Sequence, residues 1–92
     1  MKPEIKPGLA VFSQKGRDKG RPFVVLFEMD ADFVAICDGR THPPEKPKKK
    51  RRKHLKPIGR EFPELVALFK QNRLTRGDLN KALEPLASAT DR

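Results

Sequence analysis

The feature that most constrains the fold is a series of three short apolar runs in the first half of the chain. Residues 8–14, 23–29 and 33–37 are rich in Val, Phe and Ile, and clusters of Gly, Pro or Asp bound each of them. β-Branched and aromatic residues between turn-forming residues are typical of β-strands. Together they predict an antiparallel meander.

Apolar side chains occupy both faces of the second and third runs. Successive side chains of a strand point to opposite faces. One face of the second run therefore carries Phe23, Val25, Phe27 and Met29, and the other carries Val24 and Leu26. The third run is apolar on both faces in the same way. A sheet with one wet face would alternate apolar with polar residues, so we expect a barrel interior on one side and a cover from elsewhere in the chain on the other.

The segment after the third run predicts a connection and a short closing strand. Three prolines interrupt residues 41–50, which fits a long connection or an edge strand. Residues 54–58 can supply the closing strand. With 92 residues the chain is too short for two ordinary domains, so we expect a single core, with residues 1–60 forming the barrel and residues 61–92 a helical extension.

Two short helices are predicted after the barrel. Apolar residues recur at helical spacing beyond residue 60, and Pro63 suits a first helical turn. A second helix is expected to begin near Thr75, which forms a capping-box pattern with Asp78. We expect residues 61–87 to fold back over the exposed apolar face of the sheet.

The net charge is concentrated in one segment, residues 46–60. Nine of the 21 Lys and Arg residues lie there, and no Asp or Glu interrupts them. Twelve basic residues balance twelve acidic ones elsewhere, so this segment carries the whole net charge of +9. Such a run repels itself and is stabilised by a polyanion, which favours a polyphosphate partner. The alternatives are a solvated segment or a nuclear localisation signal at residues 48–53.

A second basic cluster lies in the connection between the first two runs. Residues 15–21 read Lys-Gly-Arg-Asp-Lys-Gly-Arg. Gly16 and Gly20 allow positive φ in a tight return, and Asp18 can close a local hydrogen-bonded turn. The remaining positions are basic. Turn formation alone is the alternative to contact with a polyanion, because any tight hairpin needs such glycines.

Together with the strands around it, this loop resembles the KOW motif. The similarity lies in a glycine-led strand at residues 8–12, the Gly-Arg-Asp-Lys-Gly loop at 16–20, Asp38-Gly39, and the Glu-Lys-Pro-Lys-Lys-Lys run at 45–50. It covers about residues 8–58 and is closest to small KOW-domain RNA-binding proteins of the ribosomal-protein type. One departure is Pro22-Phe23, where many KOW motifs have another glycine.

The resemblance implies a fold and a partner. KOW motifs belong to SH3-like β-barrels of large-subunit ribosomal proteins and transcription elongation factors. It therefore implies a small SH3-like (KOW) barrel. With the helices predicted from their spacing, the expected fold is a mainly β protein, a small SH3-like (KOW) barrel with two short C-terminal α-helices packed on it. The resemblance also implies contact with RNA, most of all ribosomal RNA, and neighbouring ribosomal proteins as further partners.

Strand order suggests how the basic segments come together. Successive turns of a meander lie at opposite ends of a sheet, so the loop 15–21 and the connection 38–47 are expected at one end, and the acidic turn 28–32 at the other. We expect one basic end to dock on RNA phosphates, with little base readout. Among the phenylalanines, Phe12 is the candidate for stacking on a base. The predicted RNA-binding residues are Lys15, Arg17, Lys19, Arg21, Lys46, Lys48, Lys49, Lys50, Arg51, Arg52, Lys53, His54 and Lys56, and the loop-forming residues are Gly16, Asp18 and Gly20.

Other function classes have weaker support. A single cysteine, Cys37, and two isolated histidines assemble no zinc spacing, so no metal and no cofactor are expected. Turn chemistry explains the carboxylates of residues 28–32 better than catalysis does, and we expect neither enzymatic activity nor a small-molecule substrate. The helical region 61–92 has five basic and five acidic residues, which favours packing over DNA reading.

The expected location is the cytoplasm, in association with the ribosome. The start of the chain has no apolar stretch of signal-peptide length, and no run of about 18 apolar residues occurs, so no contact with a membrane is expected. The rival interpretation is a protein-interaction KOW module of a transcription elongation or translation factor. Nonspecific binding to DNA is a third.

Overall fold

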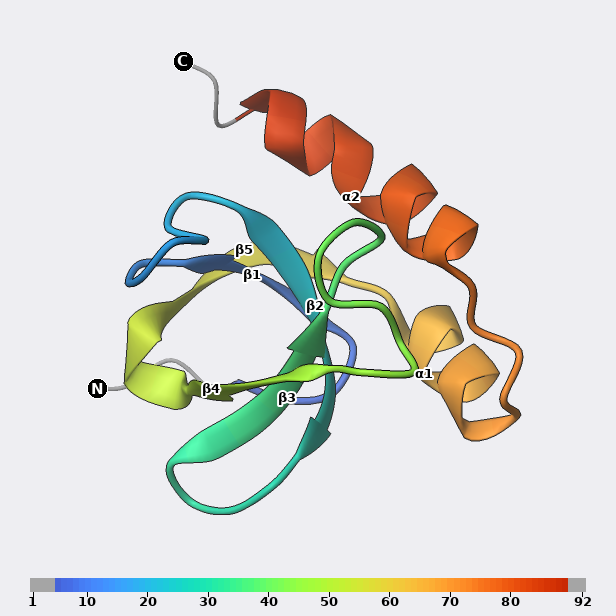
Figure 1. Ribbon diagram of the computed structural model, residues 1–92, viewed down its shortest axis with the longest axis horizontal. Helices are drawn as coiled ribbons and strands as arrows, with labels where there is room; N and C mark the ends of the chain where they lie inside the picture. Colours follow the sequence, from blue (N-terminus) through green and yellow to red (C-terminus); the bar gives the residue numbers. More distant parts are fainter. Residues whose placement is uncertain (1–4, 90–92) are drawn as a thin grey trace.

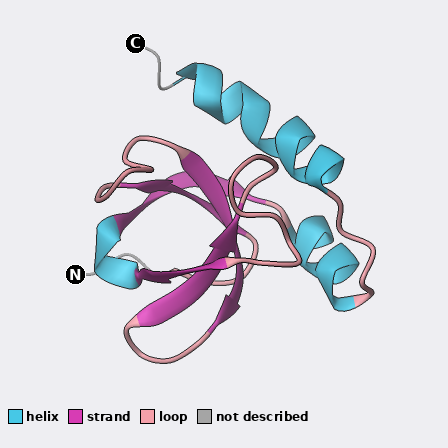
Figure 2. Cartoon of the chain, viewed as in Figure 1, coloured by secondary structure: helices cyan, strands magenta, loops and turns pink. Residues whose placement is uncertain are grey.

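The strands of the protein form one strongly curved antiparallel sheet, shown in the computed structural model of Figure 1. The structure describes residues 5–89, and the side chains of residues 5–87. The sheet consists of β1 (Leu9–Ser13), β2 (Pro22–Glu28), β3 (Phe33–Cys37), β4 (Lys48–Arg51) and β5 (Leu55–Glu61). A 3-10 turn, η1 (Arg52–His54), joins β4 to β5, and helices α1 (Pro63–Lys70) and α2 (Arg76–Ala89) follow (Figure 2).

The order of the strands is β4-β3-β2-β1-β5. The meander of β1, β2 and β3 confirms the prediction from the three apolar runs. Residues 41–50 contain both of the predicted features, since a connection leads into the edge strand β4. β5 is longer than the predicted closing strand and pairs with β1 alone. In the described part of the chain β4 and β5 are not paired, so the sheet is curved but not closed.

The chain length predicts a single core, but the sheet separates two apolar cores, because both of its faces are apolar and each is covered. The concave side of the sheet encloses the first of them. Val11 of β1, Phe23 and Val25 of β2, and Val34 and Ile36 of β3 are completely buried there. Their alternation along each strand points them to the same side. The core is completed by Ile5, Leu9 and Leu55. This is the interior that the two-faced apolar pattern predicts.

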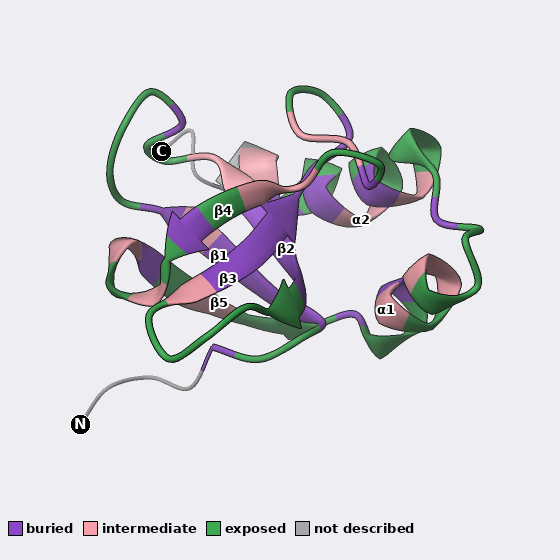
Figure 3. Ribbon diagram, turned by 60° about the horizontal axis from the view of Figure 1, so that its bottom comes forward, coloured by how far each residue is buried: buried purple, intermediate pink, exposed green. Residues whose placement is uncertain are grey.

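The second core lies between the other face of the sheet and the two helices. Val24 and Leu26 of β2 are buried against the apolar stripe of the helices. The buried members of this core are Ala10, Val24, Leu26, Cys37, Phe62, Leu65, Leu74, Leu79, Leu83 and Leu86. Figure 3 shows that β1, β2 and β3 are largely buried, whereas β4 and β5 are mostly half-buried or exposed. The prediction that residues 61–87 cover the sheet is confirmed.

The alternation predicted for the second strand breaks at Phe27. The register of β2 on β3 shifts between Val25 and Phe27, as at a β-bulge. Phe27 stacks on Phe69 of α1, with ring centroids 5.9 Å apart, and so lies on the helix side. Met29, expected on the same face as Phe23, follows the end of β2 and is 46% exposed. The prediction that Phe27 shares a face with Phe23 and Val25 is therefore wrong, because alternation holds only while the ladder is regular.

The start of α2 has the predicted capping box. The Thr75 N–H donates to Asp78 Oδ2 and the Asp78 N–H donates to Thr75 Oγ1, each at 3.1 Å. These hydrogen bonds satisfy two of the four backbone N–H groups that have no partner within the helix at the N-terminus of α2.

Gly39 allows α2 to approach the sheet closely. A Cβ atom at this position would lie 2.6 Å from the carbonyl oxygen of Arg76, in the first turn of α2, and would also collide with the Asn80 side chain. Only a residue without a side chain fits against backbone at that distance. The glycine of the Asp38-Gly39 pair is thus explained by packing.

Candidate nucleic-acid interface

The loop 15–21 is a tight hairpin built on two glycines. Gly16 and Gly20 both have φ of +85°, the left-handed region that the sequence predicts for them. The Gly20 N–H donates to the carbonyl of Ser13 at 2.7 Å and closes the hairpin at its base. Within the loop, the Arg21 N–H donates to the carbonyl of Asp18 at 3.0 Å.

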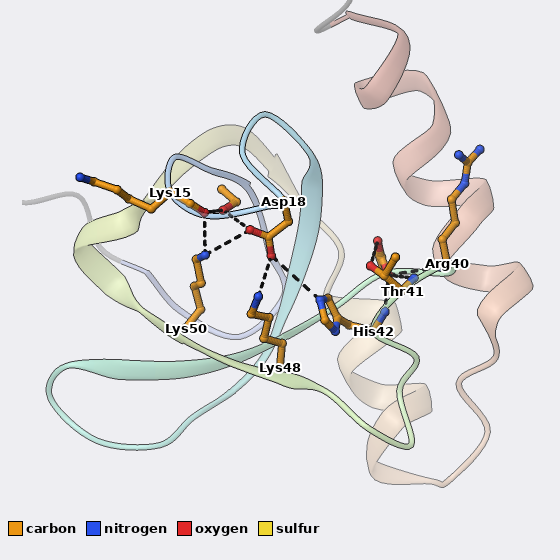
Figure 4. A network of polar contacts seen from close by, with 9 residues as sticks. Lys15, Asp18, Arg40, Thr41, His42, Lys48 and Lys50 are labelled. Carbon is orange, nitrogen blue, oxygen red and sulfur yellow. Dashed lines mark hydrogen bonds and ion pairs between the residues drawn. The ribbon is translucent and has the colours of Figure 1, made fainter.

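The carboxylate of Asp18 has a different role from the predicted one. It does not close the local turn, which the backbone carbonyl of Asp18 closes instead, but ties the loop to other segments (Figure 4). Asp18 Oδ1 accepts hydrogen bonds from Ser13 Oγ at 3.0 Å and Lys50 Nζ at 3.2 Å. Asp18 Oδ2 accepts one from Lys48 Nζ at 3.2 Å and lies 4.0 Å from His42 Nε2. The loop is therefore held on β4 by a buried ion-pair network.

The pKa of Asp18 reflects this network. Burial desolvates the carboxylate and acts to raise its pKa, but the hydrogen bonds from Ser13, Lys48 and Lys50 outweigh that effect and bring the pKa from 3.8 to about 2. The group is charged at every physiological pH. Lys48 and Lys50 of the basic segment share this carboxylate, which neutralises one of their two positive charges within the protein.

Strand geometry divides the basic segment into two sets of side chains. Lys48 and Lys50 of β4 point toward Asp18, while Lys49 and Arg51 point to the opposite side. Lys50 has 9% of its side chain exposed, and its ammonium group also donates to the carbonyl of Lys15 at 2.9 Å. Lys50 was predicted to contact RNA, but in this fold its donors are used inside the protein, so we remove it from the interface. Lys48 keeps 35% of its side chain exposed.

Arg52 lies at the acidic end of the sheet. Its guanidinium donates to Glu28 Oε1 at 2.8 Å, to the carbonyl of Asp30 at 3.0 Å and to the carbonyl of Ile5 at 2.7 Å. Its backbone N–H donates to the carbonyl of Asp32. The prediction of a single basic end is therefore wrong in part, because β4 carries the basic segment from the end where the loop lies across to the acidic turn. Arg52 forms a structural ion pair with Glu28 there.

The turn η1 returns the chain to the base of the loop. The carbonyl of His54 accepts a hydrogen bond from the Gln14 N–H at 2.8 Å. Partial desolvation lowers the pKa of His54, and the positive charges of Lys53, Lys15, Lys50 and Arg51 lower it further. The pKa of His54 is therefore lowered in part by positive charges from the loop, β4 and η1.

The connection 38–47 lies beside the loop, as predicted. Asp38 Oδ1 accepts hydrogen bonds from the backbone N–H groups of Arg40, Thr41 and His42 at 3.2, 2.9 and 2.8 Å, which fixes the turn. Residues of this turn, the loop and α2 line an open groove of about 640 Å³. Its lining contains both basic and acidic side chains, among them Arg40 and Glu84. The groove is therefore a weaker anion site than the loop itself.

Most of the predicted contact residues are accessible and have no acidic partner. Eight of the thirteen are exposed, and none of the eight forms a salt bridge with a described residue. Arg21, Lys48, Arg52 and His54 are half-buried, and Lys50 is buried. The exposed set consists of Lys15, Arg17, Lys19, Lys46, Lys49, Arg51, Lys53 and Lys56.

Sequence reasoning did not find the pairing of Lys48 and Lys50 with Asp18. If residues 48–51 are assigned to a strand, alternation of its side chains places Lys48 and Lys50 on one side and Lys49 and Arg51 on the other. The pairing with Asp18 can be inferred only after that assignment. The composition of this run, four consecutive basic residues after three prolines, does not indicate a strand.

Two further observations concern other kinds of site. Within residues 5–87, no three His, Cys, Asp or Glu side chains lie together as the ligands of a metal ion would. Neither described helix has the length and apolar character needed to cross a bilayer.

Comparison with known proteins adds no family assignment. No family model and no curated protein sequence matches this chain.

Proposed function

We propose that this chain is a non-catalytic RNA-binding protein that docks on RNA phosphates through the loop 15–21, η1 and the outward side of β4. The observation that carries the proposal is the set of eight exposed cations with no acidic partner among the described residues, six of which lie on the loop, β4 and η1, where the Asp18 network joins the loop to β4. Unpaired cations on an ordered backbone favour a polyanion, because little backbone order has to be created on binding. Ribosomal RNA is the proposed target, with the ribosome as the site of action in the cytoplasm.

We also propose that the curved sheet is an SH3-like barrel of the KOW type. Five antiparallel strands, an enclosed apolar core and a basic loop between β1 and β2 support this assignment. In such a barrel the loop belongs to the RNA-facing side, which agrees with the exposed positions of Lys15, Arg17 and Lys19.

The proposed mechanism makes a quantitative prediction for salt. Neutralising about five to eight phosphates lowers log K by about 0.7 to 0.9 per contact for each log unit of salt. The expected slope is therefore between about −3.5 and −7. Base sequence should have a small effect, because most contacts reach the backbone.

Binding to fragments of ribosomal RNA at several salt concentrations tests the proposal. The triple variant Lys15→Gln, Arg17→Gln, Lys19→Gln should weaken binding to all fragments and flatten the slope by about 2 to 3. The matched control changes three exposed cations of the helical region, Lys70→Gln, Arg73→Gln and Lys81→Gln, and removes the same charge. Equal effects of the two variants, or no effect of the loop variant, would overturn the proposed interface.

A second candidate function is a protein-interaction module of a transcription elongation or translation factor. The observation in its favour is the pair of exposed apolar side chains Phe27 and Met29, which are 37% and 46% exposed near the acidic end. If partner proteins co-purify equally well after ribonuclease treatment and RNA does not, this candidate replaces the RNA proposal.

A further inference from the structure

Phe33 differs from the other phenylalanines in its surroundings. It is the first residue of β3, is half-buried, and faces away from the interior that holds Val34. Arg51 lies directly opposite it on the edge strand β4. Lys49 Nζ lies 4.3 Å and Arg51 Cζ 4.8 Å from the centre of its ring. An aromatic ring is thus flanked by two exposed cations.

We infer that Phe33, with Lys49 and Arg51, forms a stacking site for one unpaired base of the bound RNA. The inference rests on the proposed function and deepens it by naming the form of RNA, a single-stranded nucleotide bound on the outward side of β3 and β4. Aromatic rings bracketed by Lys and Arg are typical of sequence-tolerant binding to single strands, because every base has a π-face and every nucleotide a phosphate.

The other phenylalanines are less suited to this role. Phe23 and Phe62 are buried, and Phe27 and Phe69 stack on each other. Phe12, the candidate from the sequence, is half-buried and lies opposite Lys56, but no cation of the described residues sits over its ring. Among the six phenylalanines, Phe33 alone combines partial exposure with described cations over its ring.

The charges around Phe33 give the nucleotide an orientation. The acidic turn 28–32 immediately precedes Phe33 and disfavours phosphate at that side. Lys49 lies on the other side, opposite Ala35, and is free of salt bridges to described residues. The uncharged base of the nucleotide therefore stacks on Phe33, and the phosphate of the same nucleotide lies toward Lys49. β4 is an edge strand, so no neighbouring strand covers this surface.

Loss of the ring should weaken binding to single-stranded RNA without changing its salt dependence. Stacking on an aromatic side chain contributes about 1 to 3 kcal/mol per base, so Phe33→Leu should raise the Kd about 5- to 150-fold. The salt slope should stay at the wild-type value, because the substitution removes no charge. Phe27→Leu, a matched change of an exposed phenylalanine, should leave the Kd unchanged, and circular dichroism verifies that both variants fold.

A fluorescent substitution reports stacking directly. The chain has no Trp and no Tyr, so Phe33→Trp introduces a single fluorophore. An unpaired oligoribonucleotide should quench its emission, and the same oligonucleotide with abasic nucleotides should bind with little quenching. The result that overturns the inference is wild-type affinity of Phe33→Leu together with equal quenching by intact and abasic RNA. If the unaltered protein binds no RNA at all, the proposed function itself fails, and the two failures are thereby distinguished.

Discussion

Replacing Asp18 by Asn removes the charge that holds the loop 15–21 on β4. The carboxylate has 5% of its side chain exposed and accepts hydrogen bonds from Ser13, Lys48 and Lys50. The pKa of this carboxylate is 3.8 in the unfolded chain and about 2 in the folded protein. This difference contributes about 2 kcal/mol to the free energy of unfolding at neutral pH. The variant also leaves the buried Lys50 ammonium without a counter-charge, which costs more. We expect a loss of about 2 to 4 kcal/mol.

Urea denaturation followed by far-ultraviolet circular dichroism measures this loss, and pH identifies its cause. The pKa of Asp18 is lower in the folded state, so its contribution is complete only above about pH 5 and is lost as the pH falls toward 2. About half should remain at pH 3. The difference in the free energy of unfolding between wild type and Asp18→Asn should therefore be constant from pH 7 to 5 and shrink below pH 4.

The control variant is Asp32→Asn, which makes the same change of net charge at an exposed position. It should alter the free energy of unfolding by less than about 0.5 kcal/mol. The reasoning is refuted if Asp18→Asn is no more destabilising than Asp32→Asn. It is equally refuted if the difference between wild type and Asp18→Asn does not change with pH.

Other substitutions and one titration test separate parts of the structure. Gly39→Ala should destabilise the protein by about 1 to 3 kcal/mol in urea denaturation, because its Cβ meets the Arg76 carbonyl. Gly77→Ala, in the first turn of α2, makes only an ordinary contact with Thr75 Oγ1 at 3.7 Å and should be neutral or slightly stabilising; equal effects of the two substitutions contradict the close packing at Gly39. Thr75→Ala should cost about 0.5 to 2 kcal/mol through loss of the capping box, and an unchanged midpoint contradicts that role. The pKa of His54, followed by NMR of its ring protons, should rise when RNA neutralises the surrounding cations, and an unchanged pKa in a formed complex places the RNA elsewhere.

The sequence was sufficient for the general architecture. The three apolar runs predicted β1, β2 and β3, and the presence of apolar residues on both faces predicted that a second element covers the sheet. Helical spacing with a capping box predicted where α2 begins. These features are local or follow from periodicity, and both can be read from one sequence. The bulge at Phe27 could not be predicted, because it depends on how β2 pairs with β3.

The candidate site was predictable as a set of residues but not as an arrangement. The positive φ of Gly16 and Gly20 was predictable, because glycine has no Cβ atom and adopts positive φ without strain. Lys50 and Lys49 point to opposite sides because β4 is a strand whose side chains alternate. A run of lysines does not by itself show that these residues form a strand. The role of Asp18 depends on contacts with residues 30 and 32 positions later, which no local pattern contains. The position of Arg52 beside Glu28 is set by the tertiary fold in the same way.

The central claim is that the exposed cations of the loop and β4 bind ribosomal RNA, and crosslinking in cells tests it most directly. Wild type, the loop triple variant and the helical triple variant are crosslinked to RNA with ultraviolet light, purified under denaturing conditions and analysed by sequencing of the bound RNA. The account predicts enrichment of ribosomal RNA with wild type and with the helical variant, and its loss with the loop variant. Equal, low RNA recovery from all three proteins, with partner proteins retained after ribonuclease treatment, would contradict it.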